Sequence, residues 1–125
     1  MRVLRGAVFD VALDIRRGSP NFGRWTSVLL SAENKIQLYV PAGFAHGFCV
    51  PEGAEPAEVL YKCSDYYSGA ADQKGVLWSD PALAIPWPCA QPIVSPKDQQ
   101  HLPLGPDRLD LPVFHGSPHA LQPPP

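Results

Sequence analysis

The chain has 125 residues, of which 45% are hydrophobic, and its formal net charge at pH 7 is −2. This length allows a single domain with a core of its own. The weak charge excludes the strongly basic surfaces that bind nucleic acid or anionic membranes. Sixteen prolines and ten glycines interrupt the chain often. They disfavour long helices and favour an all-β fold.

The three cysteines, Cys49, Cys63 and Cys89, are an odd number without a Cys-x-x-Cys spacing. This pattern argues against a disulfide framework and against a zinc site, and free thiols fit a reducing cytoplasm. The N-terminal segment lacks the long apolar run of a secretory signal. No apolar run approaches the roughly 20 residues that span a bilayer. We therefore expect a cytoplasmic protein without a membrane partner.

Short strands joined by turns are predicted over the first half of the chain. Residues 3–15 form one or two strands broken at Gly6, with apolar residues alternating along one face from Phe9 to Ile15. Further strands are predicted at residues 25–30, 36–40, 44–50 and 59–64, with turns rich in glycine and proline between them. Repeated short strands of this kind favour a sandwich or a jelly-roll barrel.

The second half of the chain has a weaker strand pattern. A further short strand is predicted at residues 75–78, a helical turn begins at Pro81, and another begins at Pro96 with Ser95 as its N-cap. After about residue 103 the composition shifts to proline, histidine, glycine and leucine. We expect residues 1–104 to form the domain and residues 105–125 to be a mobile, disordered tail.

His46 is the most informative single residue, because it lies between Phe44 and Phe48 in the segment YVPAGFAHGF. Residues two apart on a strand share a face, so the imidazole is expected to point with two phenyl rings into an apolar pocket. Tyr61 is placed in the same way on the next predicted strand. Either residue alone is more often a packed core residue. Together they predict a reaction chamber inside a β-barrel.

Asp10 lies on the less apolar face of its predicted strand. A hydrogen bond to His46 across the barrel is one outcome, and a surface carboxylate is the commoner one. A metal site inside a barrel needs several histidine and glutamate ligands close together, and only His46 is well placed. We therefore expect no metal site.

Five segments make the chain resemble the dTDP-4-dehydrorhamnose 3,5-epimerases: GAVFDVALDIRRGSPNFGRW, LSAENKIQLYVPAGFAHGF, LYKCSDYY, WSDPALAIPWP and PIVSPKDQ. They run in the family's order over roughly residues 3–100, and several are long and idiosyncratic. The resemblance implies an all-β, cupin-like jelly roll with one or two short C-terminal helical turns. It also implies a homodimer and the cofactor-independent epimerisation of a dTDP-linked 4-keto-6-deoxy sugar in dTDP-rhamnose biosynthesis.

The same resemblance implies three catalytic roles. Tyr61 falls at the position of the family's general acid, and His46 falls at a histidine that lines the sugar site. Asp98 falls at the aspartate that pairs with the catalytic base. Without the resemblance, Asp98 could equally be a first-turn helix residue that the helix dipole favours.

Three further residues are implied in substrate binding. Lys97 falls where the family contacts the nucleotide, although a lysine in this position is solvent-facing by default. The paired Tyr66 and Tyr67 match two tyrosines near the nucleoside. Base stacking or cross-strand packing would explain either of them.

The family's proton-abstracting histidine belongs to a Gly-Leu-His-type strand, followed shortly by a lysine that helps to hold the C4 oxygen. None of the four histidines, His46, His101, His115 and His119, takes the place of that base by motif. We therefore expect the 125-residue polypeptide alone to have little or no epimerase activity. The alternatives are a non-catalytic jelly roll that binds nucleotide sugars, an inactive fragment, or a coding sequence that starts further upstream.

Overall fold

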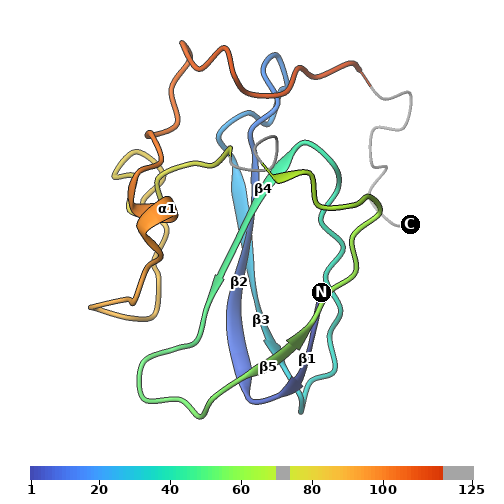
Figure 1. The fold of residues 1–125 in the computed structure, drawn as a ribbon, viewed down its shortest axis with the longest axis vertical. Coiled ribbons are helices and arrows are strands. Elements are labelled where there is room, and N and C mark those ends of the chain that lie inside the picture. The colour runs from blue at the N-terminus through green and yellow to red at the C-terminus, as the bar shows by residue number, and fades with distance from the viewer. Residues whose placement is uncertain (70–73, 117–125) are drawn as a thin grey trace.

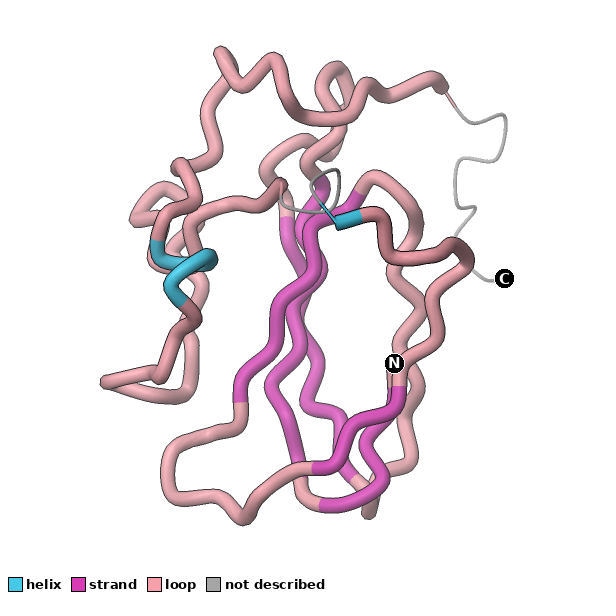
Figure 2. The backbone as a smooth tube through the Cα atoms, in the orientation of Figure 1, coloured by secondary structure: helices cyan, strands magenta, loops and turns pink. Residues whose placement is uncertain are grey.

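A computed structural model describes residues 1–69 and 74–116, and its regular structure is almost entirely β-strand (Figure 1). The elements of this described part are β1 (Arg2–Arg5), β2 (Ala7–Asp14), β3 (Trp25–Ser31), β4 (Phe44–Cys49), β5 (Glu58–Leu60) and the short helix α1 (Pro96–Gln99). Loops connect them and make up much of the remaining chain (Figure 2). The all-β prediction is confirmed.

The strands form two antiparallel sheets, one with the order β3-β2-β4 and the other with β1 paired to β5. The predicted break at Gly6 is the point where the chain leaves one sheet for the other. Its φ of 71° lies in the left-handed region, which glycine adopts without steric cost. A Cβ at this position would also lie only 2.8 Å from the carbonyl oxygen of Pro56.

Apolar clusters cover both faces of β2, which is why its central and C-terminal residues are buried. One cluster joins the two sheets and is built on Val3, Val8 and Leu30. The other lies on the opposite face and packs Leu13 against Leu83 and neighbouring apolar side chains. Figure 1 shows α1 on one side of the three-stranded sheet and β1 and β5 on the other.

Three predicted strands are absent or shorter. Residues 36–40 have no ladder, although Leu38 exchanges two hydrogen bonds of 2.9 Å with Met1. Residues 75–78 likewise lie outside the strands, and β5 ends at Leu60 instead of continuing to residue 64. An apolar strand-like pattern is present in each segment, but a strand also needs a continuous partner, which pairwise contacts of this kind do not supply.

Both predicted helical turns are confirmed. At Pro96 the Ser95 hydroxyl accepts a hydrogen bond of 3.1 Å from the backbone N–H of Asp98. At Pro81 the structure has a single turn at residues 81–83, in which the Asp80 carbonyl accepts from the backbone N–H groups of Leu83 at 3.1 Å and Ala84 at 3.3 Å. There the Asp80 carboxylate accepts from the backbone N–H groups of Ala82 at 2.9 Å and Leu104 at 2.7 Å.

The prediction of a mobile tail from residue 105 is wrong for residues 105–116. Leu111 is only 3% exposed. The backbone N–H of Arg17 donates to Pro112 at 2.7 Å, and the Arg17 carbonyl accepts from Phe114 at 2.9 Å. Residues 117–125, which include His119, lie outside the described residues. Within the described ranges, no helix is long and apolar enough to cross a membrane.

Candidate functional site

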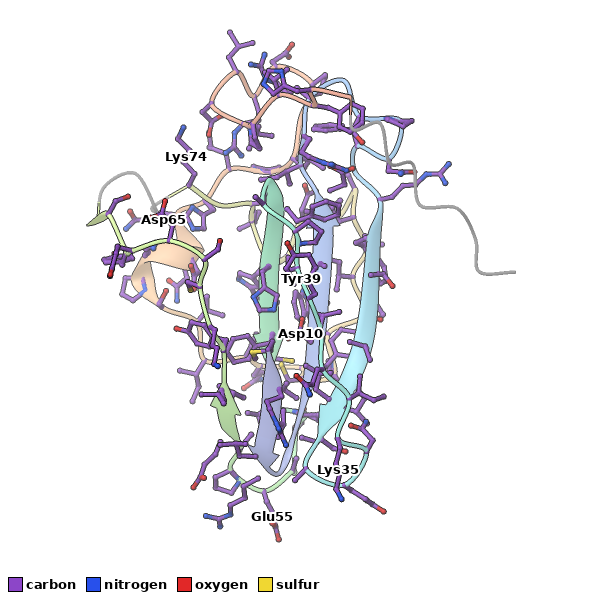
Figure 3. The ribbon with its side chains drawn as sticks, turned by 90° about the vertical axis from the view of Figure 1, so that its right-hand side faces the viewer. Asp10, Lys35, Tyr39, Glu55, Asp65 and Lys74 are labelled. Carbon is purple, nitrogen blue, oxygen red and sulfur yellow. The ribbon has the colours of Figure 1, made fainter. Side chains whose placement is uncertain are left out.

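The buried carboxylate of Asp10 holds the imidazole of His46. In the β2–β4 ladder Asp10 is opposite Phe48 and His46 is opposite Ala12, so Asp10 and His46 are diagonal neighbours on one face. The Nε2 atom of His46 lies 2.8 Å from Oδ1 and 3.0 Å from Oδ2 of Asp10. A carboxylate only accepts, so Nε2 carries the proton and Nδ1 remains for a ligand. Figure 3 shows Asp10 within the sheet.

Asp10 is fully buried, so the expectation of a surface carboxylate is wrong, and the alternative hydrogen bond to His46 is confirmed. The alternation in β2 identifies the face that Asp10 shares with Val8. It does not reveal that the second sheet covers this face through Val3 of β1 and Val59 of β5. The side chain of His46 is 30% exposed and remains accessible to a small molecule.

A cavity of about 580 Å³ lies beside β4, which is an edge strand. Its volume is in the range of small-molecule sites, which are mostly apolar with a few polar groups. The apolar part of its wall includes Val11, Leu13, Phe44, Trp78, Leu83, Ile85, Trp87 and Val94. The charged or titratable side chains other than cysteine that line it are His46, Lys74, Lys97, Asp98 and His101.

Three polar residues of the cavity come from α1 and the turn after it. Lys97 and Asp98 belong to the helix that Ser95 caps, and His101 follows two residues after its end. The Nε2 atom of His101 lies 3.4 Å from Oδ1 of Asp98. The imidazole also lies over Gly75, where any Cβ would overlap it. Sequence reasoning missed His101 as a cavity residue, and its i, i+3 spacing from Asp98 was the available signal.

The predicted tyrosines lie elsewhere. Tyr61, Tyr66 and Tyr67 are 61%, 95% and 76% exposed. None of them lines the cavity that His46 lines. The predicted chamber shared by His46 and Tyr61 is therefore not formed within the described residues. The physical reason is that β5 stops at Leu60 and pairs with β1 in the other sheet, so strand alternation does not orient Tyr61.

A second buried carboxylate, Asp14, holds the start of β4 in place. It accepts hydrogen bonds from Nε and Nη2 of Arg16 at 2.9 and 2.7 Å and from the Ser19 hydroxyl at 2.6 Å. The Arg16 guanidinium lies 4.5 Å from the ring centroid of Phe44 and 4.9 Å from that of Phe114. Through these contacts Phe44, the first residue of β4, and the C-terminal segment with Phe114 are attached to the end of β2. Phe44 lies two residues before His46.

No cluster of three or more histidine, cysteine, aspartate or glutamate side chains suited to a metal ion occurs in residues 1–69 and 74–116.

The sequence model of the dTDP-4-dehydrorhamnose 3,5-epimerase family matches residues 1–105, which is most of the chain. The chain belongs to this family. The predicted recognition is confirmed.

Two curated dTDP-4-dehydrorhamnose 3,5-epimerases illustrate the similarity to the family. The Neisseria gonorrhoeae protein is 54% identical over 99 residues, which are 78% of this chain and 29% of the relative. The Shigella flexneri protein is 52% identical over 98 residues, again 78% of this chain and 52% of the relative. The chain thus spans about half of the Shigella protein and less of the Neisseria protein.

Solved epimerases share the architecture. The Legionella pneumophila dTDP-6-deoxy-D-glucose 3,5-epimerase, in complex with dTDP-4-keto-L-rhamnose, superposes with a TM-score of 0.80 at 46% identity, covering 92% of this chain and 61% of that one. A 3′-monoepimerase from Streptomyces bikiniensis, in complex with dTDP-quinovose, has a TM-score of 0.75 at 35% identity, with 89% and 56% coverage. The predicted cupin-like jelly roll of the epimerase family is confirmed.

Proposed function

We propose that the protein acts on a dTDP-linked 4-keto-6-deoxy sugar and inverts the carbons beside its ketone as a 3,5-epimerase. Membership of the epimerase family supports this reaction class. The complex of the Legionella relative with dTDP-4-keto-L-rhamnose supports the substrate class. The observation that carries the proposal is His46, a residue that lines the cavity and whose imidazole is held by the buried Asp10.

The reaction needs few groups. A ketone at C4 acidifies the hydrogens at C3 and C5, removal of one gives an enolate, and a proton returned to the opposite face inverts the centre. Each general acid or base contributes about 10²–10⁴-fold. A donor preorganised at the developing oxyanion contributes about 3 kcal/mol. Neither step needs a redox cofactor, and an acid and a base on opposite sides of the sugar suffice.

His46 is suited to the role of the donor. Its Nε2–H is engaged with the Asp10 carboxylate, and a buried carboxylate electrostatically complements a charged imidazole. In that charged form Nδ1–H donates a hydrogen bond to a sugar or enolate oxygen. We propose that Asp98 orients the base, that Lys97 binds the nucleotide phosphates and that Tyr61 is the general acid.

Tyr66 and Tyr67 are proposed to contact the nucleoside, since both rings are exposed. The position of Tyr61 outside the cavity favours a second candidate, a jelly roll that binds the nucleotide sugar without turning it over. In that case the cavity with His46 and Lys97 would hold the ligand, and no acid would reach the sugar from the opposite side.

Two measurements separate these functions. We expect calorimetry to detect dTDP binding, and proton NMR in deuterated water then follows exchange at C3 and C5 of dTDP-4-keto-6-deoxyglucose. Exchange supports the epimerase, and binding without exchange supports the binding module. The control ligand dTDP-glucose has no C4 ketone and should bind without exchange. Failure to bind either nucleotide and failure to exchange would contradict both proposals.

We also propose that the protein forms a homodimer in the cytoplasm. β3 and β4 are the edges of the three-stranded sheet, and Leu29 and Phe48 on these edges are 51% and 42% exposed. Apolar strand edges favour association. Light scattering after size exclusion should give a dimer mass that decreases on dilution. A monomer mass at every concentration would contradict the dimer.

A further inference from the structure

Two cysteine side chains meet at the wall of the cavity. Cys49 is the last residue of β4, and Cys89 lies in the loop before α1. Both line the same cavity, and the Cys89 thiol is a close enough neighbour to raise the pKa of Cys49. Both are half-buried, whereas the third cysteine, Cys63, is exposed. Neither the reaction nor the proposed substrate contacts use this pair.

Contacts on both sides of Cys89 hold it against the end of β4. The backbone N–H of Glu52 donates to the carbonyl of Pro88 at 2.9 Å, and the Glu52 carboxylate accepts from the N–H of Ala90 at 3.0 Å. Glu52 is only three residues from Cys49. The two cysteines therefore meet because their backbones are tied together, and not through one chance side-chain rotamer.

An aromatic contact also holds the loop with Cys89 next to Cys49. Phe9 is opposite Cys49 in the β2–β4 ladder, and its ring packs edge to face on Trp87 with centroids 5.8 Å apart. The indole N–H of Trp87 donates to the carbonyl of Trp78 at 2.8 Å. Trp87 is two residues before Cys89, so the loop that carries Cys89 is anchored to β2 as well.

We propose that Cys49 and Cys89 form a reversible disulfide that ties the end of β4 to the loop at residues 85–90 and locks one wall of the cavity. The oxidant is a low-molecular-weight disulfide such as oxidised glutathione. One of the two cysteine thiolates attacks one glutathione sulfur, forms a mixed disulfide and releases one reduced glutathione. The other cysteine thiolate then attacks the sulfur of the first cysteine and releases the second reduced glutathione. Two electrons pass to the oxidant, and the two thiol protons end on the two glutathione molecules.

The surroundings of Cys49 affect the rate of the reaction. Burial, reinforced by the neighbouring Cys89 thiol, raises the pKa of Cys49 to about 11. A thiol of this kind is almost entirely protonated at neutral pH and attacks slowly. In the second step, attack within one molecule compensates for a small thiolate fraction.

Peptide mapping tests the pair directly. Cleavage after lysine places each cysteine on its own peptide, namely residues 36–62, 63–74 and 75–97. After treatment with oxidised glutathione and alkylation of remaining thiols, we expect peptide 36–62 joined to peptide 75–97, with the loss of two hydrogen atoms. Dithiothreitol should separate them. Stable glutathione adducts on Cys89, two alkylated cysteines, or a link to peptide 63–74 would overturn the proposal.

Matched variants make the test independent of nucleotide binding. Cys63→Ser removes the exposed thiol and should still form the link, whereas Cys89→Ser should leave Cys49 reduced. A link that closes a long loop restricts the unfolded chain. We therefore expect oxidation to raise the melting temperature of Cys63→Ser by several degrees and to leave that of Cys89→Ser unchanged. An equal shift in both variants would contradict a specific disulfide.

Discussion

Replacement of Asp14 by asparagine is expected to lower the free energy of unfolding by about 3 kcal/mol. The Asp14 side chain is 1% exposed and accepts from Arg16 and from the Ser19 hydroxyl. An asparagine keeps one acceptor oxygen but turns an NH₂ group toward donors, and it leaves the Arg16 charge unpaired. The start of β4 at Phe44, which packs on Arg16, should loosen as a result.

Asp110→Asn is the matched control. Arg108 holds Asp110 through the same fork, with Nε and Nη2 each 2.7 Å from the carboxylate, but the Asp110 side chain is 43% exposed. Arg108 itself is 12% exposed, but because the Asp110 carboxylate reaches solvent we expect this pair to contribute about 1 kcal/mol or less. Urea unfolding of both variants measures the difference. Equal destabilisation would show that burial does not make the Asp14 network stronger than the surface pair.

The pH dependence of stability is a second test of the Asp14 network. Burial alone would raise the pKa of Asp14, but the hydrogen bonds from Arg16 and Ser19 outweigh it and lower the pKa to about 2, against an ordinary value of 3.8. Between these values the unfolded chain binds more protons than the folded one. The stabilisation is thus complete above about pH 4 and is lost as the pH falls toward 2. In Asp14→Asn this part of the acid-induced loss should be absent.

The local sequence pattern correctly predicted those strands whose neighbours are also regular strands. β2 and β3 pair over seven residues in register, and their alternation and the turn at Gly6 are visible in the sequence. The segment 36–40 has the same alternation, but it has no strand ladder. Its Leu38 exchanges two backbone hydrogen bonds with the N-terminal residue Met1. Alternation states which residues share a face, and it does not state whether a partner strand lies beside them.

Burial was the least predictable property, because it depends on distant parts of the chain. Asp10 and Asp14 occupy the less apolar face of β2, yet a second sheet and the Arg16 side chain cover them. The composition of residues 105–116 predicted disorder. A few specific contacts, above all the buried Leu111 and the backbone bonds of Arg17, are enough to order this segment.

The candidate site was predictable only in part for the same reason. The motif around His46 identified the imidazole, and the S-x-K-D segment identified Lys97 and Asp98, all three of which line one cavity. The pairing of Cys49 with Cys89 has no sequence signal, since forty residues separate them and only the folded loop brings them together. The roles of the predicted catalytic and binding residues stay predictions.

His46→Asn is expected to bind dTDP as the wild type does and to slow any exchange that the wild type supports at C3 and C5 of the keto sugar by about 10²–10³-fold. Free dTDP lacks the 4-keto-6-deoxy sugar, so its binding does not need the His46 donor. The variant loses the hydrogen bond that strengthens as charge develops on the enolate oxygen. Parallel titrations with dTDP and exchange rates by NMR measure the two effects separately.

Asp10→Asn tests whether the carboxylate acts through the imidazole. The amide can still accept from Nε2 of His46, so the ring keeps its orientation but loses the negative charge that complements its protonated form. We expect about a tenfold loss in the exchange rate, with dTDP affinity unchanged. Glu55→Gln, at the lower end of the molecule in Figure 3 and outside the cavity, is the control and should change neither. An Asp10→Asn variant that lost stability but exchanged at the wild-type rate would make Asp10 a purely structural residue.

A His46→Asn variant that lost dTDP binding as well would show that the imidazole contacts the nucleotide and not the keto sugar.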